Sequence, residues 1–204
     1  MKKAWKRILI CGLLAAGLWT AGLVRDRQFL NRQLIRLHVI ANSDSEEDQR
    51  IKLQVRDAVL DSLQEDLEGI GDVEQAKAYL RENLPKIQTV ANRTLKLAGV
   101  DAQAVAALGK EAYDTREYDT FSLPAGVYES LRILIGDGAG KNWWCVAFPS
   151  LCLSATTEDF TQTAQTAGMR GALTETLSGE DGYQLRFFLL DALGKAEKAI
   201  FAGK

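Results

Sequence analysis

The sequence contains few of the residues that most catalytic sites, metal sites and disulfide scaffolds require. Its 204 residues include one histidine, three cysteines and three prolines, while the hydrophobic share is 47% and the charged share is 25%. This composition is typical of an ordinary globular protein, and it excludes the collagen-like, low-complexity and disulfide-scaffold classes. The length is sufficient for one sizeable hydrophobic core.

Basic residues are also scarce outside the N-terminus. Four cations stand together without an acid, and the rest of the chain holds 21 basic and 27 acidic residues; the four are Lys2, Lys3, Lys6 and Arg7. The body of the protein is therefore acidic and has no basic run. Neutralising phosphates requires clustered Lys and Arg, so the sequence predicts no nucleic-acid partner.

An uncharged apolar segment, Ile8–Val24, follows the four cations and ends at Arg25. As a helix, its 17 residues would be about 25 Å long, slightly less than the roughly 30 Å hydrocarbon core of a bilayer. Residues 1–25 are therefore predicted to be a signal peptide or a signal anchor, and the length does not decide between them. Because the basic end stays in the cytoplasm, the segment contacts the membrane and residues 26–204 should emerge on the outer face.

The first part of this outer region has the pattern of one strand followed by a block of helices. Alternating apolar residues predict an N-terminal strand over 34–41. The short polar side chains of 42–45 favour a turn and a helix start, and apolar residues at three- and four-residue spacing predict a helix to about Leu67. Capping and proline signals predict two further helices, over 72–83 and 85–98.

The second half changes to a strand-like period. Short apolar runs at 131–135 and 143–148 surround a glycine-rich loop and predict an antiparallel sheet with a hairpin. Residues 154–181 are rich in Thr, Ser and Gly, so we expect a poorly ordered or weakly helical connector, followed by a C-terminal helix within 182–204. The predicted fold class is α+β, with one α+β domain over 26–153.

The glycine-rich loop does not match a nucleotide-binding loop. Such a loop has four residues between its first Gly and the Gly-Lys pair, then Ser or Thr and a helix. Here the segment Gly136–Lys141 has three residues in that place and is followed by Asn142 and a predicted strand. A hairpin turn is the simpler interpretation, because glycine adopts positive φ at no steric cost.

His38 is the single histidine, and no motif places a nucleophile or a set of metal ligands around it. The Asp-Thr pairs at 114–115 and 119–120 lack the glycine that follows the catalytic aspartate of an aspartic protease. We therefore predict that the protein is not an enzyme and has no catalytic residue, metal site or cofactor. An extracytoplasmic hydrolase that uses His38 and nearby carboxylates is the alternative.

Two cysteines and two tryptophans near the second strand pattern are more informative. Cys145 and Cys152 would face an oxidising compartment after export, and the chain between them can fold back, so a disulfide is sterically reasonable; two buried free thiols are the alternative. Trp143 and Trp144 are adjacent, so on a strand they must point to opposite faces. One can enter the core, and the other needs a second cover or a partner.

A partner-binding face is predicted where this surplus aromatic surface meets the polar end of the first strand. Interaction hot spots combine such features. The residues predicted to bind a partner are His38, Asn42, Asp44, Trp143 and Trp144.

Several strings of the sequence resemble the stage II sporulation protein R family of endospore-forming bacteria. The similarity spans about residues 30–153 and extends to the C-terminal helix. The strings that carry it are Leu37–Gln49, Leu123–Tyr128, Gly140–Cys145, Phe148-Pro149 and Leu151-Cys152.

The resemblance implies a signalling protein that is made in the forespore and exported into the space between the two membranes of the sporangium. Its expected partner is a membrane-embedded aspartic protease of the mother cell, stage II sporulation protein GA. Activation of that protease would lead to cleavage of the precursor of the sporulation sigma factor E. The resemblance transfers no contact residues.

Overall fold

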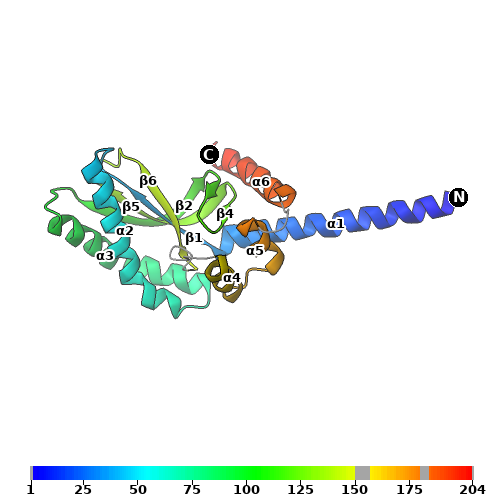
Figure 1. The fold of residues 1–204 in the computed structure, drawn as a ribbon, viewed down its shortest axis with the longest axis horizontal. Helices are drawn as coiled ribbons and strands as arrows, with labels where there is room; N and C mark the ends of the chain where they lie inside the picture. The colour runs from blue at the N-terminus through cyan, green and yellow to red at the C-terminus, as the bar shows by residue number, and fades with distance from the viewer. Residues whose placement is uncertain (1, 150–156, 180–183, 204) are drawn as a thin grey trace.

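The computed structural model describes residues 2–149, 157–179 and 184–203, which form a body of helices and strands from which one long helix extends (Figure 1). The helices are α1 (Lys2–Gln33), α2 (Glu46–Glu68), α3 (Val73–Leu97), α4 (Thr157–Thr166), α5 (Gly171–Ser178) and α6 (Gln184–Ala202). The strands are β1 (Ile35–Ile40), β2 (Ala104–Tyr113), β3 (Arg116–Glu117), β4 (Ser122–Leu123), β5 (Gly126–Ile135) and β6 (Asn142–Phe148).

The main sheet has the strand order β2-β5-β1-β6, so β1 is central. β1 is parallel to β5 and antiparallel to β6, whereas β2 is antiparallel to β5. The α+β class is confirmed, but the sheet is mixed rather than antiparallel, because the long connection through α2, α3 and β2 lets β5 return beside β1 in the same direction. The element at the N-terminus is a helix rather than a strand.

The hairpin predicted around the glycine-rich loop is also wrong. β5 and β6 lie on either side of β1, and the loop 136–141 crosses the end of β1 to join them. Residues 41–44 hold this loop: the backbone N–H of Gly140 donates to the carbonyl of Ala41 at 3.0 Å, and that of Ala139 donates to Asn42 at 3.1 Å. Within the described chain, the small second sheet formed by β3 and β4 has the hairpin arrangement.

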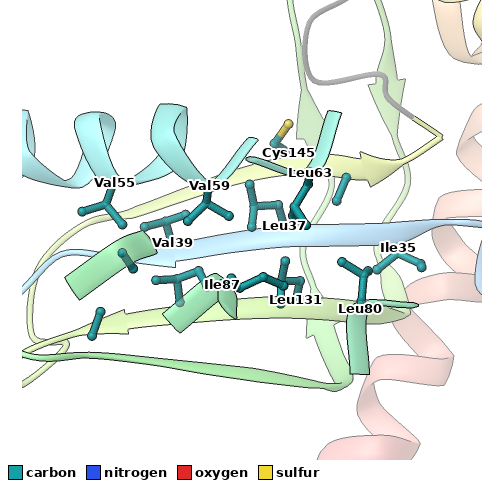
Figure 2. Close-up of a cluster of buried hydrophobic side chains, with 14 of the residues drawn as sticks. Ile35, Leu37, Val39, Val55, Val59, Leu63, Leu80, Ile87, Leu131 and Cys145 are labelled. Carbon is teal, nitrogen blue, oxygen red and sulfur yellow. The ribbon is translucent and has the colours of Figure 1, made fainter. Parts of the chain in front are cut away.

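One hydrophobic core lies between the sheet and the helices α2 and α3. Alternate residues of β1, namely Ile35, Leu37 and Val39, are fully buried on this face, and Figure 2 shows them packed against side chains of both helices. The helices begin where the sequence predicts: Ser45 caps α2 by accepting a hydrogen bond from the N–H of Asp48. Replacing one of these fully buried side chains by a smaller one would leave a cavity here.

α3 is one helix and not the two that the sequence predicts. Pro85 lies inside it, although a proline in a helix interior costs about 3 kcal/mol or more. The apolar stripe runs through Leu80, Ile87, Ala91 and Leu95 without a change of face, and all four are fully buried. The burial of this stripe on both sides of Pro85 offsets the lost helical hydrogen bond.

A second core covers the opposite face of the sheet. It gathers residues from both ends of the chain; the buried members are Leu23, Leu30, Leu34, Tyr113, Phe121, Leu123, Tyr128, Val146, Phe160, Ala164, Met169, Leu173, Leu177 and Leu190. The stretch 154–181, expected as a connector, thus contains two helices that contribute to this core. Its few large apolar residues are nearly all buried. A prediction based on composition underestimates how much these few residues contribute to the core.

α1 joins this second core through its last three turns. Its described residues up to Ala21 are exposed, whereas Leu23, Asp26 and Leu30 are buried. The boundary predicted at residue 25 therefore lies within one continuous helix. The buried carboxylate of Asp26 forms ion pairs with both Arg170, at the start of α5, and Arg186, in α6.

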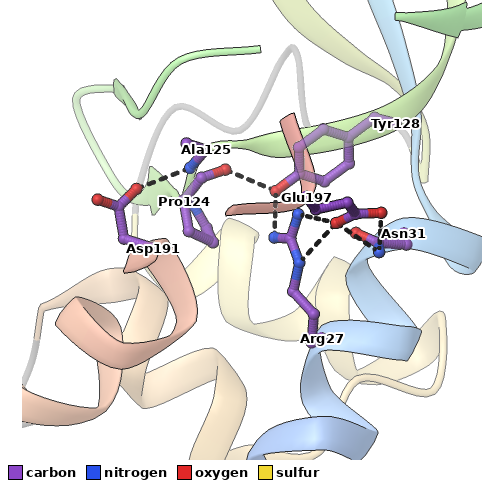
Figure 3. Close-up of polar contacts among 7 residues, drawn as sticks. All are labelled: Arg27, Asn31, Pro124, Ala125, Tyr128, Asp191 and Glu197. Atoms are coloured by element: carbon purple, nitrogen blue, oxygen red, sulfur yellow. Dashed lines mark hydrogen bonds and ion pairs between the residues drawn. The ribbon is translucent and has the colours of Figure 1, made fainter. Parts of the chain in front are cut away.

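A second set of polar contacts joins α1 to α6 and to the loop before β5 (Figure 3). Arg27 donates to Glu197 at 2.7 Å, and the amide of Asn31 donates to the same carboxylate. On the other side of α6, Asp191 accepts a hydrogen bond from the N–H of Ala125 at 2.8 Å. α6 is thus fixed to both neighbours.

Gly194 allows this close approach of α6. A Cβ atom added there would lie 1.6 Å from the carbonyl oxygen of Ala125, which is backbone and cannot move aside cheaply. We therefore expect Gly194→Ala to lower the free energy of unfolding by roughly 1–3 kcal/mol, although Ala is the better helix former.

The matched control is Gly171→Ala in α5, where an added Cβ meets nothing within 4 Å. Thermal or urea unfolding of the purified full chain should show a loss for Gly194→Ala and none for Gly171→Ala. Equal stability of the two variants would mean that α6 does not dock as described.

Candidate functional site

The structure brings the five predicted partner-binding residues to one corner of the sheet. β6 runs antiparallel to β1 there, so that Trp144 is paired with His38 and Trp143 with Val39. The loop that carries Asn42 and Asp44 follows directly from β1. The five residues therefore lie close together, as expected, but their side chains differ in exposure and in how far their polar groups are already hydrogen-bonded.

Asn42 and Asp44 are used to hold the chain together. The side-chain oxygen of Asn42 accepts from the N–H of Asp137 at 3.1 Å, and its amide donates to Asp48 at 3.1 Å. Asp44 accepts from the N–H of Lys141 at 2.7 Å. Their hydrogen-bonding groups thus fix the crossing loop at the start of α2, although the side chain of Asp44 stays on the surface.

His38 lies on the face of β1 opposite the first core and is only 7% exposed. Its Nδ1 donates to a carboxylate oxygen of Glu111 at 2.8 Å, and its ring stacks on Trp144 with 5.5 Å between centroids. Its Nε2 has no hydrogen-bond partner among the described residues. His38 therefore supports Trp144 from beneath the surface rather than offering an exposed polar group.

Glu111 is the centre of a small polar network. Ser130 donates to its second carboxylate oxygen at 2.9 Å, and Tyr113 donates to the same oxygen at 3.2 Å. Burial opposes ionisation of Glu111, but the hydrogen bonds from His38, Ser130 and Tyr113 outweigh it, so its pKa lies below the usual value. The carboxylate is therefore ionised at neutral pH.

Arg36 is the neighbouring residue on the same face of β1 and is fully buried. Its Nε donates to the carbonyl of Cys145 at 3.0 Å, and its guanidinium lies 4.3 Å from the centroid of the Tyr113 ring and 5.3 Å from that of Tyr128. Burial raises the pKa of Tyr113, although the charge of Arg36 opposes this. The ring of Tyr118, between β3 and β4, lies 5.9 Å away, so three aromatic rings surround this buried cation.

This network does not pair its serine with its histidine. The Ser130 hydroxyl bonds to Glu111 and not to His38, whereas a serine nucleophile needs contact with its base. A hollow of about 140 Å³ beside Glu111 is lined by Ser130 and Arg132 as well, but not by His38. In the part of the chain that the structure describes, no group of three or more His, Cys, Asp or Glu residues could hold a metal ion.

The two tryptophans point to opposite faces of β6, as strand geometry requires. Trp144 is partly buried between the His38 ring and the guanidinium of Arg116, which lies 3.4 Å from its centroid. Trp143 is 38% exposed and lies over Arg56 of α2, at 4.3 Å. Of the five predicted residues, Trp143 therefore presents the largest exposed apolar surface.

Cys145 is buried on β6 beside these residues. Its predicted disulfide partner, Cys152, lies outside the described residues. The pairing of the two cysteines stays a prediction.

The residues that organise this corner were not predicted as site residues. Glu111 and Tyr113 lie on β2, more than seventy positions from His38 in the sequence, and only the strand order brings them together. The one available signal is the alternation of β1 itself, which places Arg36 and His38 on the face away from the first core. A charged residue so placed either meets water or needs buried partners.

The pKa of Glu111 predicts how stability depends on pH. A carboxylate whose pKa is lowered in the folded state contributes stability above its unfolded value, near 4.5, and loses it as the pH falls through the lower folded value. Glu111→Gln cannot ionise, so its free energy of unfolding should decline less steeply below about pH 4.5 than that of the wild type. Urea unfolding at pH 7 and pH 3 measures this.

The control for this experiment is Glu175→Gln, which changes an exposed carboxylate on α5. Its pH dependence should follow that of the wild type. If the Glu111→Gln and wild-type curves are parallel, the network does not favour the ionised carboxylate.

Comparisons with known proteins place the chain in a family. The profile of stage II sporulation protein R matches residues 31–158, which include the sheet, α2, α3 and the corner described above. The stage II sporulation protein R of Bacillus subtilis (strain 168) is 32% identical over 177 residues, covering 78% of this chain and 79% of that protein. No solved structure matches the chain. The chain therefore belongs to the stage II sporulation protein R family, and its role is in sporulation.

Proposed function

We propose that this protein is an exported sporulation signal that activates a membrane-embedded aspartic protease, stage II sporulation protein GA, by binding to it. The activated protease then cleaves the precursor of sigma factor E, which couples gene expression in the mother cell to the forespore. Membership of the family, over 31–158, is the observation that carries this proposal.

α1 supports the export that this role requires. Within the described residues, one helix, α1, is long and apolar enough to cross a membrane, and its candidate span is Ala4–Gln33. Its apolar residues up to Trp19 are exposed, as expected of a segment whose proper surroundings are lipid. With the basic N-terminus in the cytoplasm, the body lies in the space between the two membranes, either released or anchored by α1.

The proposed contact face is the outer edge of β6. Among the described strands β6 pairs only with β1, so its other edge has no strand partner there. Trp143, which is 38% exposed, lies beside this edge over the partly buried Arg56, and Trp and Arg are among the residues most enriched in binding hot spots. Asp44 adds a surface charge at the same corner, while His38 and Trp144 support the strand from the opposite face.

Separate alanine substitutions of the two tryptophans test this face. Trp143→Ala should leave the fold intact and weaken binding by at least about 2 kcal/mol, roughly thirtyfold, because an exposed anchor is lost. Trp144→Ala should instead lower the free energy of unfolding by about 3 kcal/mol, since its ring is largely packed. The measurements are thermal unfolding and processing of the sigma-E precursor in cells.

The matched control is Val105→Ala, which removes exposed apolar surface from β2 at the opposite edge of the sheet. It should change neither stability nor processing. Normal processing with folded Trp143→Ala, or early unfolding of both tryptophan variants, would show that this face is not the contact.

Export itself is tested by changing α1. Leu13 and Leu14 are 65% and 63% exposed, so Asp at both positions should leave the body folded. Each charge at the centre of such a segment costs about 2.5–3.5 kcal/mol of insertion free energy, which should keep the protein in the cytoplasm and abolish signalling.

Leu97→Asp, at an exposed position at the end of α3, serves as the control and should be exported normally. Cell fractionation locates both variants, and a reporter of sigma-E activity in the same cells measures signalling. Full signalling by a protein confined to the cytoplasm would contradict the proposed function.

A further inference from the structure

We infer that the body of this protein rests directly on the outer lipid surface, with Leu185 and Phe188 of α6 in the boundary between headgroups and acyl chains. The partner is a glycerophospholipid bilayer. This inference rests on the proposed function in one respect, namely that α1 lies in the membrane with the body on its outer side. It adds the face of the body that contacts lipid.

The first argument is that no spacer separates the membrane segment from the body. α1 is one continuous helix, and its apolar run ends at Val24. Leu23, Asp26 and Arg27 are already buried in the body. Since the apolar run and the buried part of α1 overlap, the body must begin where the hydrocarbon region ends.

The second argument is that the starts of α5 and α6 lie at this level. Arg170 donates to the carbonyl oxygen of Gly22 at 3.1 Å and forms an ion pair with Asp26, and Arg186 pairs with the same carboxylate. Figure 1 shows α5 and the first turns of α6 at the end of the body from which α1 emerges. These turns therefore face the bilayer surface.

The third argument is the chemistry of that surface. Leu185 and Phe188, in the first turns of α6, are 63% and 64% exposed. Arg25 of α1 is exposed, and so is Arg170, which bonds to Gly22 of α1 three residues earlier. Exposed Leu and Phe side chains beside Arg residues are the combination by which interfacial helices bind an anionic membrane surface.

The other end of α6 lies farther from the membrane. Glu197 bonds to Arg27 and to Asn31, and Asn31 is seven residues beyond Val24, or about 10 Å along the helix axis at 1.5 Å per residue. α6 runs obliquely away from the point where α1 leaves the body (Figure 1). Ile200, although 67% exposed, should therefore remain in water.

The test measures how close three positions come to the acyl chains. An environment-sensitive fluorophore is attached to the full chain, in a Cys11→Ser background, through Phe188→Cys, Ile200→Cys or Leu14→Cys. Each labelled protein is reconstituted into vesicles of phosphatidylethanolamine and phosphatidylglycerol that contain brominated acyl chains, which quench nearby fluorophores. The Cys11→Ser protein without an added cysteine gives the background labelling.

We expect strong quenching at position 14 and quenching at position 188 at least about twofold greater than at position 200. Quenching at position 14 shows that α1 is inserted. If position 188 is then not quenched, or is quenched equally with position 200, the inference is overturned. Absence of quenching at position 14 would instead contradict the membrane placement of α1 on which the inference rests.

Discussion

The ion pairs of Asp26 are the interaction on which the arrangement of the chain ends depends. Its carboxylate is fully buried and is held by Arg170 and Arg186, so one residue of α1 joins α5 and α6. Leaving a buried charge without its partner typically costs about 3–5 kcal/mol. The last turns of α1 and the helices α5 and α6 must therefore dock together, and they cover the second face of the sheet together.

This constraint joins the exposed apolar part of α1 to the domain that carries the proposed contact face. Leu30 of α1 and Leu34, which directly precedes the central strand β1, are both buried in the second core. β1 in turn holds β6, with Trp143 and Trp144, at one edge of the sheet. If α1 remains in a membrane, the proposed face is held at a fixed height and orientation above that membrane.

The sequence predicts the elements whose signals are local, and misses those that depend on distant segments. The alternation of β1, the cap at Ser45 and the opposite faces of the two tryptophans follow from short-range geometry. The sequence predicts a helix boundary at Pro85, whereas α3 continues through it, because the burial on either side of Pro85 depends on segments distant in the sequence. The role of Glu111 could not be predicted, since it requires knowing that β2 and β5 lie beside β1.

The most direct test of this account is hydrogen exchange on the full chain reconstituted in vesicles. If the end of α1 belongs to the folded body, the amides of Arg27–Gln33 should exchange as slowly as those of β1, because both open only with the second core. Rapid exchange of Arg27–Gln33 while β1 stays protected would show that the membrane helix and the body are separate units, which contradicts the account.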